Sequence, residues 1–179
     1  MSSFSTIERV ETPRLICERM RIDHLAEVSR LLRDPRVAAT LWLGGQPPSE
    51  QEVVTSVADK ERHWERYGFG LWLVRDRETG EMAGRGGLQR TTYVKDLDEV
   101  EVGWAIVPER WREGLATELA LASIDLAFSP LELSEIVAFT LPHNVGSRGV
   151  MEKSGFVYER EILHVGLVHV LYRRRAAGD

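Results

Sequence analysis

One stretch constrains what this chain can fold into more than any other, because a strand passes through a proline into a helix. Residues Glu99–Val107, EVEVGWAIV, predict a strand that ends before Pro108. A helix follows from about Gly114. Its apolar side chains recur at helical spacing, at Leu115, Leu119, Ala122 and Leu126. A strand that leads into a helix in this way indicates a fold of the α/β class.

The start of this helix offers bare backbone instead of a capping side chain. Ser, Thr, Asp or Asn is the usual cap, but this start is built around Gly114 and Ala116. The backbone N–H groups of about Arg112 to Thr117 are therefore predicted to point outward at the positive end of the helix dipole, where a phosphate binds. Gly114 would let a diphosphate approach the backbone. The small side chain of Ala116 would keep the next helical turn from blocking it.

The neighbouring charges leave two interpretations of this helix start open. Arg110 and Arg112 add positive charge for a phosphate, whereas Glu109 and Glu113 suit the dipole of a plain helix start. Two common phosphate motifs are excluded. No Gly-Lys-Ser/Thr follows, as a Walker loop requires, and the GRGG run at Gly84–Gly87 precedes no helix, as a dinucleotide-binding turn requires.

The rest of the chain divides into elements that suit one mixed α/β domain over residues 1–179. The predicted order is strand, helix, helix, three strands, helix, strand, helix and two strands, which makes about seven strands. The other six strands are RLICERM (14–20), LWLVRD (71–76), MAGRGGL (82–88), EIVAFT (135–140), FVYEREILH (156–164) and GLVHVLYRR (166–174). The other three helices begin at Asp23 as a cap, at the capping box of Ser49 and Glu52, and at Asn144. We expect helices on both faces of the sheet.

Composition narrows the class of protein. The apolar share of 43% and the charged share of 28% are ordinary for a soluble globular protein. The net charge of -5 argues against a nucleic-acid binder and suits a cationic or amine-bearing substrate. A lone cysteine, Cys17, excludes an internal disulfide and a cysteine-based zinc site, and it is interpreted as a small core residue. The five histidines show no metal-binding pattern, so no metal is expected.

Neither a membrane nor a secretory route is indicated. No apolar run approaches the ~20 residues of a membrane span. The N-terminal sequence MSSFSTIERVETPR has no apolar signal core, so we expect a cytoplasmic protein.

Three segments of the chain carry recognisable motifs in a consistent order. They are ETPRLICERM, then EVGWAIVPERWREGLATELA, then LPHNVGSRGVMEKSGF. In this order they resemble the first strand, the coenzyme A pyrophosphate motif and the Asn-x-x-Ser helix of the GNAT superfamily of N-acetyltransferases, in its branch of ribosomal-protein alanine acetyltransferases. The resemblance runs over nearly the whole chain. It implies a mostly antiparallel sheet in which two parallel strands, 99–107 and 135–140, splay apart into a cleft for acetyl-CoA.

The resemblance also implies a set of cofactor-binding residues. The strand edge at Ala105, Ile106 and Val107 would pair with the pantetheine arm. Asn144 would hydrogen-bond the pantetheine amide or would be a simple N-cap. The helix start would hold the pyrophosphate through Arg112, Glu113, Gly114, Leu115, Ala116 and Thr117. Gly103 marks either a bulge that frees backbone groups beside the thioester or a point of close packing.

Two residues are candidates for the chemistry. Transfer of acetyl to an amine needs a neutral nucleophile, and Glu101 is the candidate base because the resemblance places a glutamate there. Strand alternation puts Glu99 on the same face, so Glu99 is the reserve, and the alternative is that both lie on a solvated face. Many relatives carry a tyrosine where this chain has Met151, which donates no proton. Ser147 is therefore the candidate donor to the departing thiolate, or else a first-turn residue that only satisfies backbone.

The favoured function is an N-acetyltransferase that moves acetyl from acetyl-CoA to a primary amine by direct attack in a ternary complex. The acceptor is a protein N-terminus, ribosomal or other, or a small amine, and Trp42 is a candidate to line its site. The alternatives are a non-catalytic module that binds coenzyme A or a partner, and an unrelated binder of ATP or NAD. Neither nucleic acid nor membrane is expected as a partner. The sequence is compatible with a homodimer and does not require one.

Overall fold

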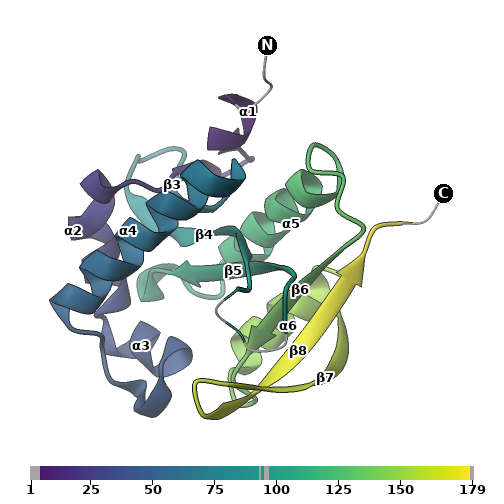
Figure 1. Cartoon of the computed structure of the whole chain (residues 1–179). Coiled ribbons are helices and arrows are strands. Elements are labelled where there is room, and N and C mark those ends of the chain that lie inside the picture. The colour runs from purple at the N-terminus through teal and green to yellow at the C-terminus, as the bar shows by residue number, and fades with distance from the viewer. Residues whose placement is uncertain (1–4, 93, 95–96, 178–179) are drawn as a thin grey trace.

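The computed structural model describes residues 5–92, 94 and 97–177, and Figure 1 shows how the elements are arranged. An open sheet of eight strands has the order β1-β2-β3-β4-β5-β6-β8-β7. Its strands are β1 (Arg9–Glu11), β2 (Leu15–Arg19), β3 (Leu71–Asp76), β4 (Met82–Arg90), β5 (Val100–Ile106), β6 (Glu135–Thr140), β7 (Val157–His164) and β8 (Leu167–Arg175). Among the described strands, only β5 and β6 run parallel. The predicted mixed, mostly antiparallel sheet is confirmed.

Helices cover both faces of this sheet, as the sequence predicts (Figure 1). They are α1 (Ser5–Glu8), α2 (Leu25–Leu32), α3 (Pro35–Leu41), α4 (Glu50–Tyr67), α5 (Leu115–Phe128) and α6 (Val145–Lys153), with 3-10 turns at Ile22–His24, Leu43–Gly45 and Pro108–Arg110. Leu71 and Leu73 of β3 pack in an apolar cluster with α2 and α4. Trp72 and Val74, which alternate with them, pack in a cluster with α5 and α6. The alternation of side chains along the strands therefore supplies one apolar layer on each face.

Three elements, α1, β1 and α3, were not predicted, and one predicted cap is wrong. The strand β1 has only three residues, too few to show an alternation, and is defined by its pairing with β2. The short helix α3 begins at Pro35 after Asp34, whose Oδ1 accepts the N–H of Arg36 at 2.8 Å. Asp23 lies inside a 3-10 turn, and His24 takes the N-cap position of α2 instead.

The helix α4 crosses one face of the sheet and follows its sequence signals closely. The capping box is confirmed, because Ser49 Oγ accepts the N–H of Glu52 at 3.3 Å and Glu52 Oε2 accepts the N–H of Ser49 at 2.7 Å. The helix ends at Gly68, which has a left-handed φ of 73°. In the described ranges, no helix combines the length and the apolarity that crossing a membrane requires.

The strands β5 and β6 separate soon after they meet. Their pairing is confined to Glu101 and Val137, while β5 stays paired with β4 up to Ile106 and β6 with β8 up to Thr140. The predicted splay is therefore present. The bulge predicted at Gly103 is wrong, because β5 pairs with β4 without any shift of register. The gap opens because the two strands diverge, not because one of them is bulged.

Candidate active site

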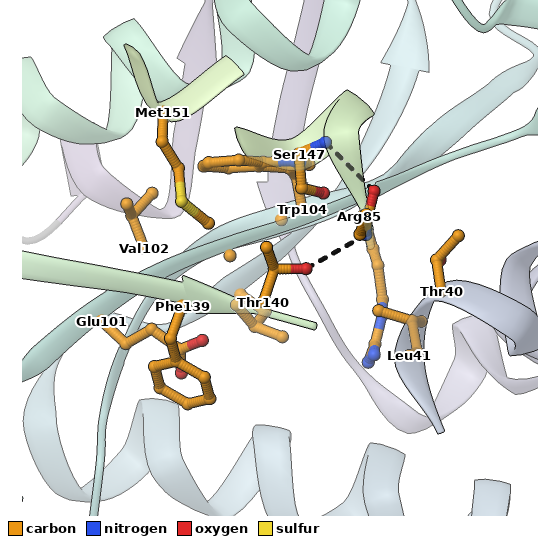
Figure 2. Close-up of a pocket in the computed structure, with 14 residues that line it drawn as sticks. Thr40, Leu41, Arg85, Glu101, Val102, Trp104, Phe139, Thr140, Ser147 and Met151 are labelled. Atoms are coloured by element: carbon orange, nitrogen blue, oxygen red, sulfur yellow. Dashed lines mark hydrogen bonds between the residues drawn. The ribbon is translucent and has the colours of Figure 1, made fainter. Parts of the chain in front are cut away.

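The divergence of β5 from β6 leaves a cavity of about 140 Å³ at the centre of the sheet (Figure 2). Its floor is β5 from Glu101 to Trp104, with Arg85 of β4 beside it. The walls are Phe139 and Thr140 of β6, Thr40 and Leu41 of α3, Ser147 and Met151 of α6, and Asn144 at the N-cap of α6. Both candidate catalytic residues, Glu101 and Ser147, therefore line one cavity, although they lie far apart in the sequence.

Glu101 is held in this cavity by a neighbour on the adjacent strand. Its side chain lies on the face that α4 covers, and the residue is only 7% exposed. Gln89 of β4 is its partner in register and donates a hydrogen bond from Nε2 to Glu101 Oε2 at 2.9 Å. A buried carboxylate needs such donors to remain ionised. The interpretation that Glu101 lies on a solvated face is thus wrong.

Gly103 leaves space beside this carboxylate. A Cβ built at Gly103 would come within 4 Å of no described neighbour except Glu101 Oε1, at 3.8 Å. The alternative of close packing at this glycine is therefore also wrong. Oxygen Oε2 of Glu101 is held by Gln89, while Oε1 borders the space that Gly103 keeps open.

Glu99 has a different environment and does not line the cavity. Both of its carboxylate oxygens bind the guanidinium of Arg173 on β8, with Arg173 Nη2 2.9 Å from Glu99 Oε1. Arg173 also binds Glu135 and Glu159, so Glu99 belongs to an ion-pair cluster. One guanidinium occupies both carboxylate oxygens of Glu99, which counts against Glu99 as the reserve base.

The two polar residues at the start of α6 have distinct roles in the structure. Asn144 is the N-cap: its Oδ1 accepts the N–H of Ser147 at 3.1 Å, and its Nδ2 donates to Thr140 Oγ1 at 3.1 Å (Figure 2). Within the described residues, the hydroxyl of Ser147 has no hydrogen-bond partner, so it does not merely satisfy backbone. Met151, which donates no proton, is buried and lines the same cavity.

The helix start after Pro108 is open, as predicted. Gly114 is the N-cap of α5 with φ 82°, no side chain caps the helix, and Arg112 also has a positive φ of 67°. Arg110 is not directed at this start, because it binds Asp76 at 3.0 Å and Glu113 at 2.6 Å. The basic group that the sequence did not reveal is Arg14. Its Nη2 would lie 3.5 Å from a Cβ at Gly114, and its Nη1 donates to the carbonyl of Glu113 at 2.8 Å, while its Nε binds Glu118 at 2.7 Å.

The edge of β5 that faces the gap is offset by one residue from the prediction. The backbone of Glu99 and of Val107 bonds toward β4, through Thr91 N–H to Glu99 O and Val107 N–H to Ala83 O, both at 2.9 Å. Antiparallel pairing alternates these directions, so Ala105 also bonds toward β4, while Trp104 and Ile106 point their backbone groups into the gap. The carbonyl of Ile106 accepts the indole N–H of Trp111 at 2.7 Å.

Other candidate residues lie outside the site. Trp42 packs against the apolar cluster under α2 and α4, and Thr40 and Leu41 line the cavity in its place. Cys17 is fully buried, and burial followed by the charge of Glu118 raises the pKa of its thiol to about 12. Its prediction as a core residue is confirmed, since a thiol of this kind is inert at neutral pH.

Comparison with known proteins identifies the family. The model of the acetyltransferase (GNAT) domain family matches residues 14–157. The chain belongs to this GNAT family. It is an acetyl-CoA-dependent N-acetyltransferase, which decides against an unrelated binder of ATP or NAD.

Relatives and solved structures agree with this assignment. This GNAT chain is 27% identical to the uncharacterised N-acetyltransferase YoaA of Bacillus subtilis, over 84% of this chain and 83% of that protein. An acetyltransferase structure from Agrobacterium tumefaciens superposes with a TM-score of 0.83 at 23% identity, over 96% of each chain. The ribosomal α-N-protein acetyltransferase RimL, solved in complex with coenzyme A, superposes with a TM-score of 0.75 at 15% identity, over 94% of this chain and 98% of RimL. At sequence identities this low, the two superpositions show that the fold is shared.

Proposed function

We propose that this GNAT enzyme, a single domain over residues 1–179, acetylates a primary amine by direct attack, with Glu101 as the general base. One observation carries the proposal: the gap between β5 and β6 brings a buried carboxylate and a hydroxyl without a described partner, Ser147, to one cavity. Acetyl-CoA supplies an activated acetyl group as a thioester. The residues of the chain then bind it, orient it and move two protons.

The chemistry requires a base because the acceptor is protonated at neutral pH. An α-amino group titrates near ~8 and a lysine near ~10.4. Glu101 takes this proton, through a water molecule, as the amine nitrogen bonds to the acetyl carbon and the carbon–sulfur bond breaks. The sulfur leaves with the electron pair. Ser147 at the start of α6 donates a hydrogen bond to it or passes it the second proton that the nitrogen loses, so that coenzyme A leaves as the thiol.

The fit of acetyl-CoA rests on three features of the site. The uncapped start of α5 presents N–H groups for the pyrophosphate, with Arg14 and Arg112 nearby. Trp104 directs its N–H and C=O into the gap, where the pantetheine arm would extend the sheet. Asn144 keeps a second Nδ2 hydrogen for a pantetheine carbonyl, in addition to the one it gives to Thr140.

The acceptor is proposed to be a protein N-terminus or a small amine. RimL is a ribosomal L7/L12 α-N-protein acetyltransferase. The cavity of about 140 Å³ accommodates the amine end of an acceptor and not a whole peptide. The body of the acceptor would lie over Leu41 and Phe139, at the side of α3 and β6.

Thermal unfolding with acetyl-CoA, with ATP and NAD in parallel, tests binding. Acetyl-CoA at 100 times its dissociation constant should add ~2.7 kcal/mol to the free energy of unfolding, which raises the melting temperature by roughly 5–10 °C for a chain of this size. Thiol release with a panel of peptides and small amines then tests turnover. A shift without thiol release for any amine would support the non-catalytic module, and the absence of a shift would overturn the proposed binding site.

A further inference from the structure

A chain of hydrogen bonds connects α4 to Glu101 through β4. Lys60 of α4 donates from Nζ to Gln89 Oε1 at 2.7 Å, and Gln89 donates from Nε2 to Glu101 Oε2 at 2.9 Å. Side chains of α4 and β4 are thus linked in series to the carboxylate of Glu101 on β5. Neither Lys60 nor Gln89 lines the cavity, so both lie behind Glu101 as seen from the substrate.

The chemistry of the three side chains fixes the direction of this chain. An ammonium group only donates hydrogen bonds, so Lys60 requires the oxygen of the Gln89 amide. The NH₂ group of Gln89 then has to face Glu101, where a carboxylate accepts it. A glutamine without this lysine could present either end of its amide, because the two ends have nearly the same shape.

Both charged ends of the chain are removed from water. Glu101 is 7% exposed, and burial followed by the charge of Arg85 lowers the pKa of Lys60 to about 8. The described charged groups that influence Lys60 are Asp59 on α4, Arg85 on β4 and Glu101 on β5. Such groups persist in a buried position when a polar group such as the Gln89 amide hydrogen-bonds to both.

We propose that Gln89 and Lys60 are positioning residues for the general base, holding Glu101 Oε2 so that Oε1 receives the proton of the acceptor amine. The proposal rests on the proposed role of Glu101. Donation from Gln89 stabilises the ionised carboxylate, so the base is ready at lower pH. It also turns Oε1 toward the space beside Gly103, where the proton arrives. Lys60 acts one step further back, by keeping the amide of Gln89 in the donating orientation.

The test compares Gln89→Leu, Lys60→Met and Lys60→Arg with wild type. Two readouts are taken against pH: kcat and KM for acetyl-CoA with a short peptide bearing a free α-amino group, and the infrared carboxyl band of Glu101, assigned by its absence in Glu101→Gln. The infrared readout needs no acceptor. Arg62→Met is the matched control, because it removes a positive charge from the exposed side of α4, where Arg62 binds Asp59.

We expect Gln89→Leu to move the ionisation of the Glu101 band and the acid limb of kcat to higher pH by about one unit, the size of one hydrogen bond to a charged group. KM for acetyl-CoA should not change. Lys60→Met should shift both in the same direction by less, Lys60→Arg should restore much of the wild-type profile, and Arg62→Met should match wild type.

The outcomes separate this proposal from the proposed base. If Gln89→Leu and Lys60→Met fold and keep the wild-type infrared and kcat profiles, the positioning role is overturned. If they only lower the melting temperature and the active fraction, without moving either profile, their role is structural and the proposal also fails. If Glu101→Gln turns over like wild type, the base assignment itself is wrong, whatever the infrared band shows.

Discussion

Glu101 and Glu99 lie two positions apart, yet they have opposite surroundings. Glu101 borders the cavity and receives an amide hydrogen bond from Gln89. Glu99 is held by both terminal nitrogens of Arg173 on β8. The difference arises because β6 and β8 lie close beside Glu99, whereas β6 turns away just after Glu101. What a carboxylate on a strand can do is therefore decided by what the neighbouring strands place beside it.

The largest effect is expected when the charge of Glu101 and the charge of Glu99 are removed in separate variants. Glu101→Gln should lower kcat by about a hundredfold to ten-thousandfold, the range for loss of a general base, while Glu99→Gln should lower it by less than about threefold. Initial rates of thiol release would measure both. The melting-temperature shift with acetyl-CoA should persist in both variants, as a control for binding. Equal losses would show that the two glutamates are not distinct in function.

A smaller effect is expected from filling the space between Gly103 and the carboxylate of Glu101. Gly103→Ala would place a methyl group about 3.8 Å from Glu101 Oε1 and displace the water that carries the proton. We expect kcat to fall about tenfold or more, as for small misplacements of reacting groups, with little change in stability. Gly149→Ala in α6 is the control, because a Cβ there would meet nothing within 4 Å. Wild-type turnover by Gly103→Ala would mean that Oε1 does not face the reaction.

The smallest effect concerns the Glu99 side of the comparison and is one of stability. The hydrogen bond from Arg173 lowers the pKa of Glu159, so the ion-pair cluster stabilises the fold above the usual carboxyl range and loses this contribution as pH falls through it. Arg173→Met should lower the free energy of unfolding by about 1–2 kcal/mol at pH 7, and the difference from wild type should shrink toward pH 3. Urea unfolding at both pH values measures it. Turnover of Arg173→Met should stay near wild type, and a difference that grows at low pH would contradict the cluster.

Much of the fold could be predicted from short stretches of sequence. The strand EIVAFT begins and ends at Glu135 and Thr140 as predicted, and the capping box of Ser49 and Glu52 starts α4 as predicted. These signals are local: side-chain alternation, helical spacing and caps depend on residues within a few positions of one another. The open start of α5 at Gly114 belongs to the same class, because a missing cap is visible in the sequence.

The short strand β1 and Gly103 of β5 could not be predicted from residues close to them in the sequence. Three residues of β1 cannot display a period, and only their pairing with β2 makes them a strand. Gly103 suggested a bulge because glycine in a strand often marks one. Its actual use, leaving room for a carboxylate, depends on strand β6 turning away and on the position of α3.

The sequence by itself determined the order of strands β2 to β8 and helices α2, α4, α5 and α6, the open helix start at Gly114 and the presence of Glu101, Asn144 and Ser147 as candidates. Only the tertiary structure decided that Glu101, not Glu99, faces the cavity, that Trp104 instead of Ala105 presents its backbone to the gap, and that Arg14 approaches the start of α5. It also decided that Lys60 and Gln89 form a chain of hydrogen bonds to Glu101. The physical reason is range: caps and periods are set by neighbours along the chain, whereas a buried hydrogen bond such as that from Lys60 to Gln89 exists only once α4 has packed on β4.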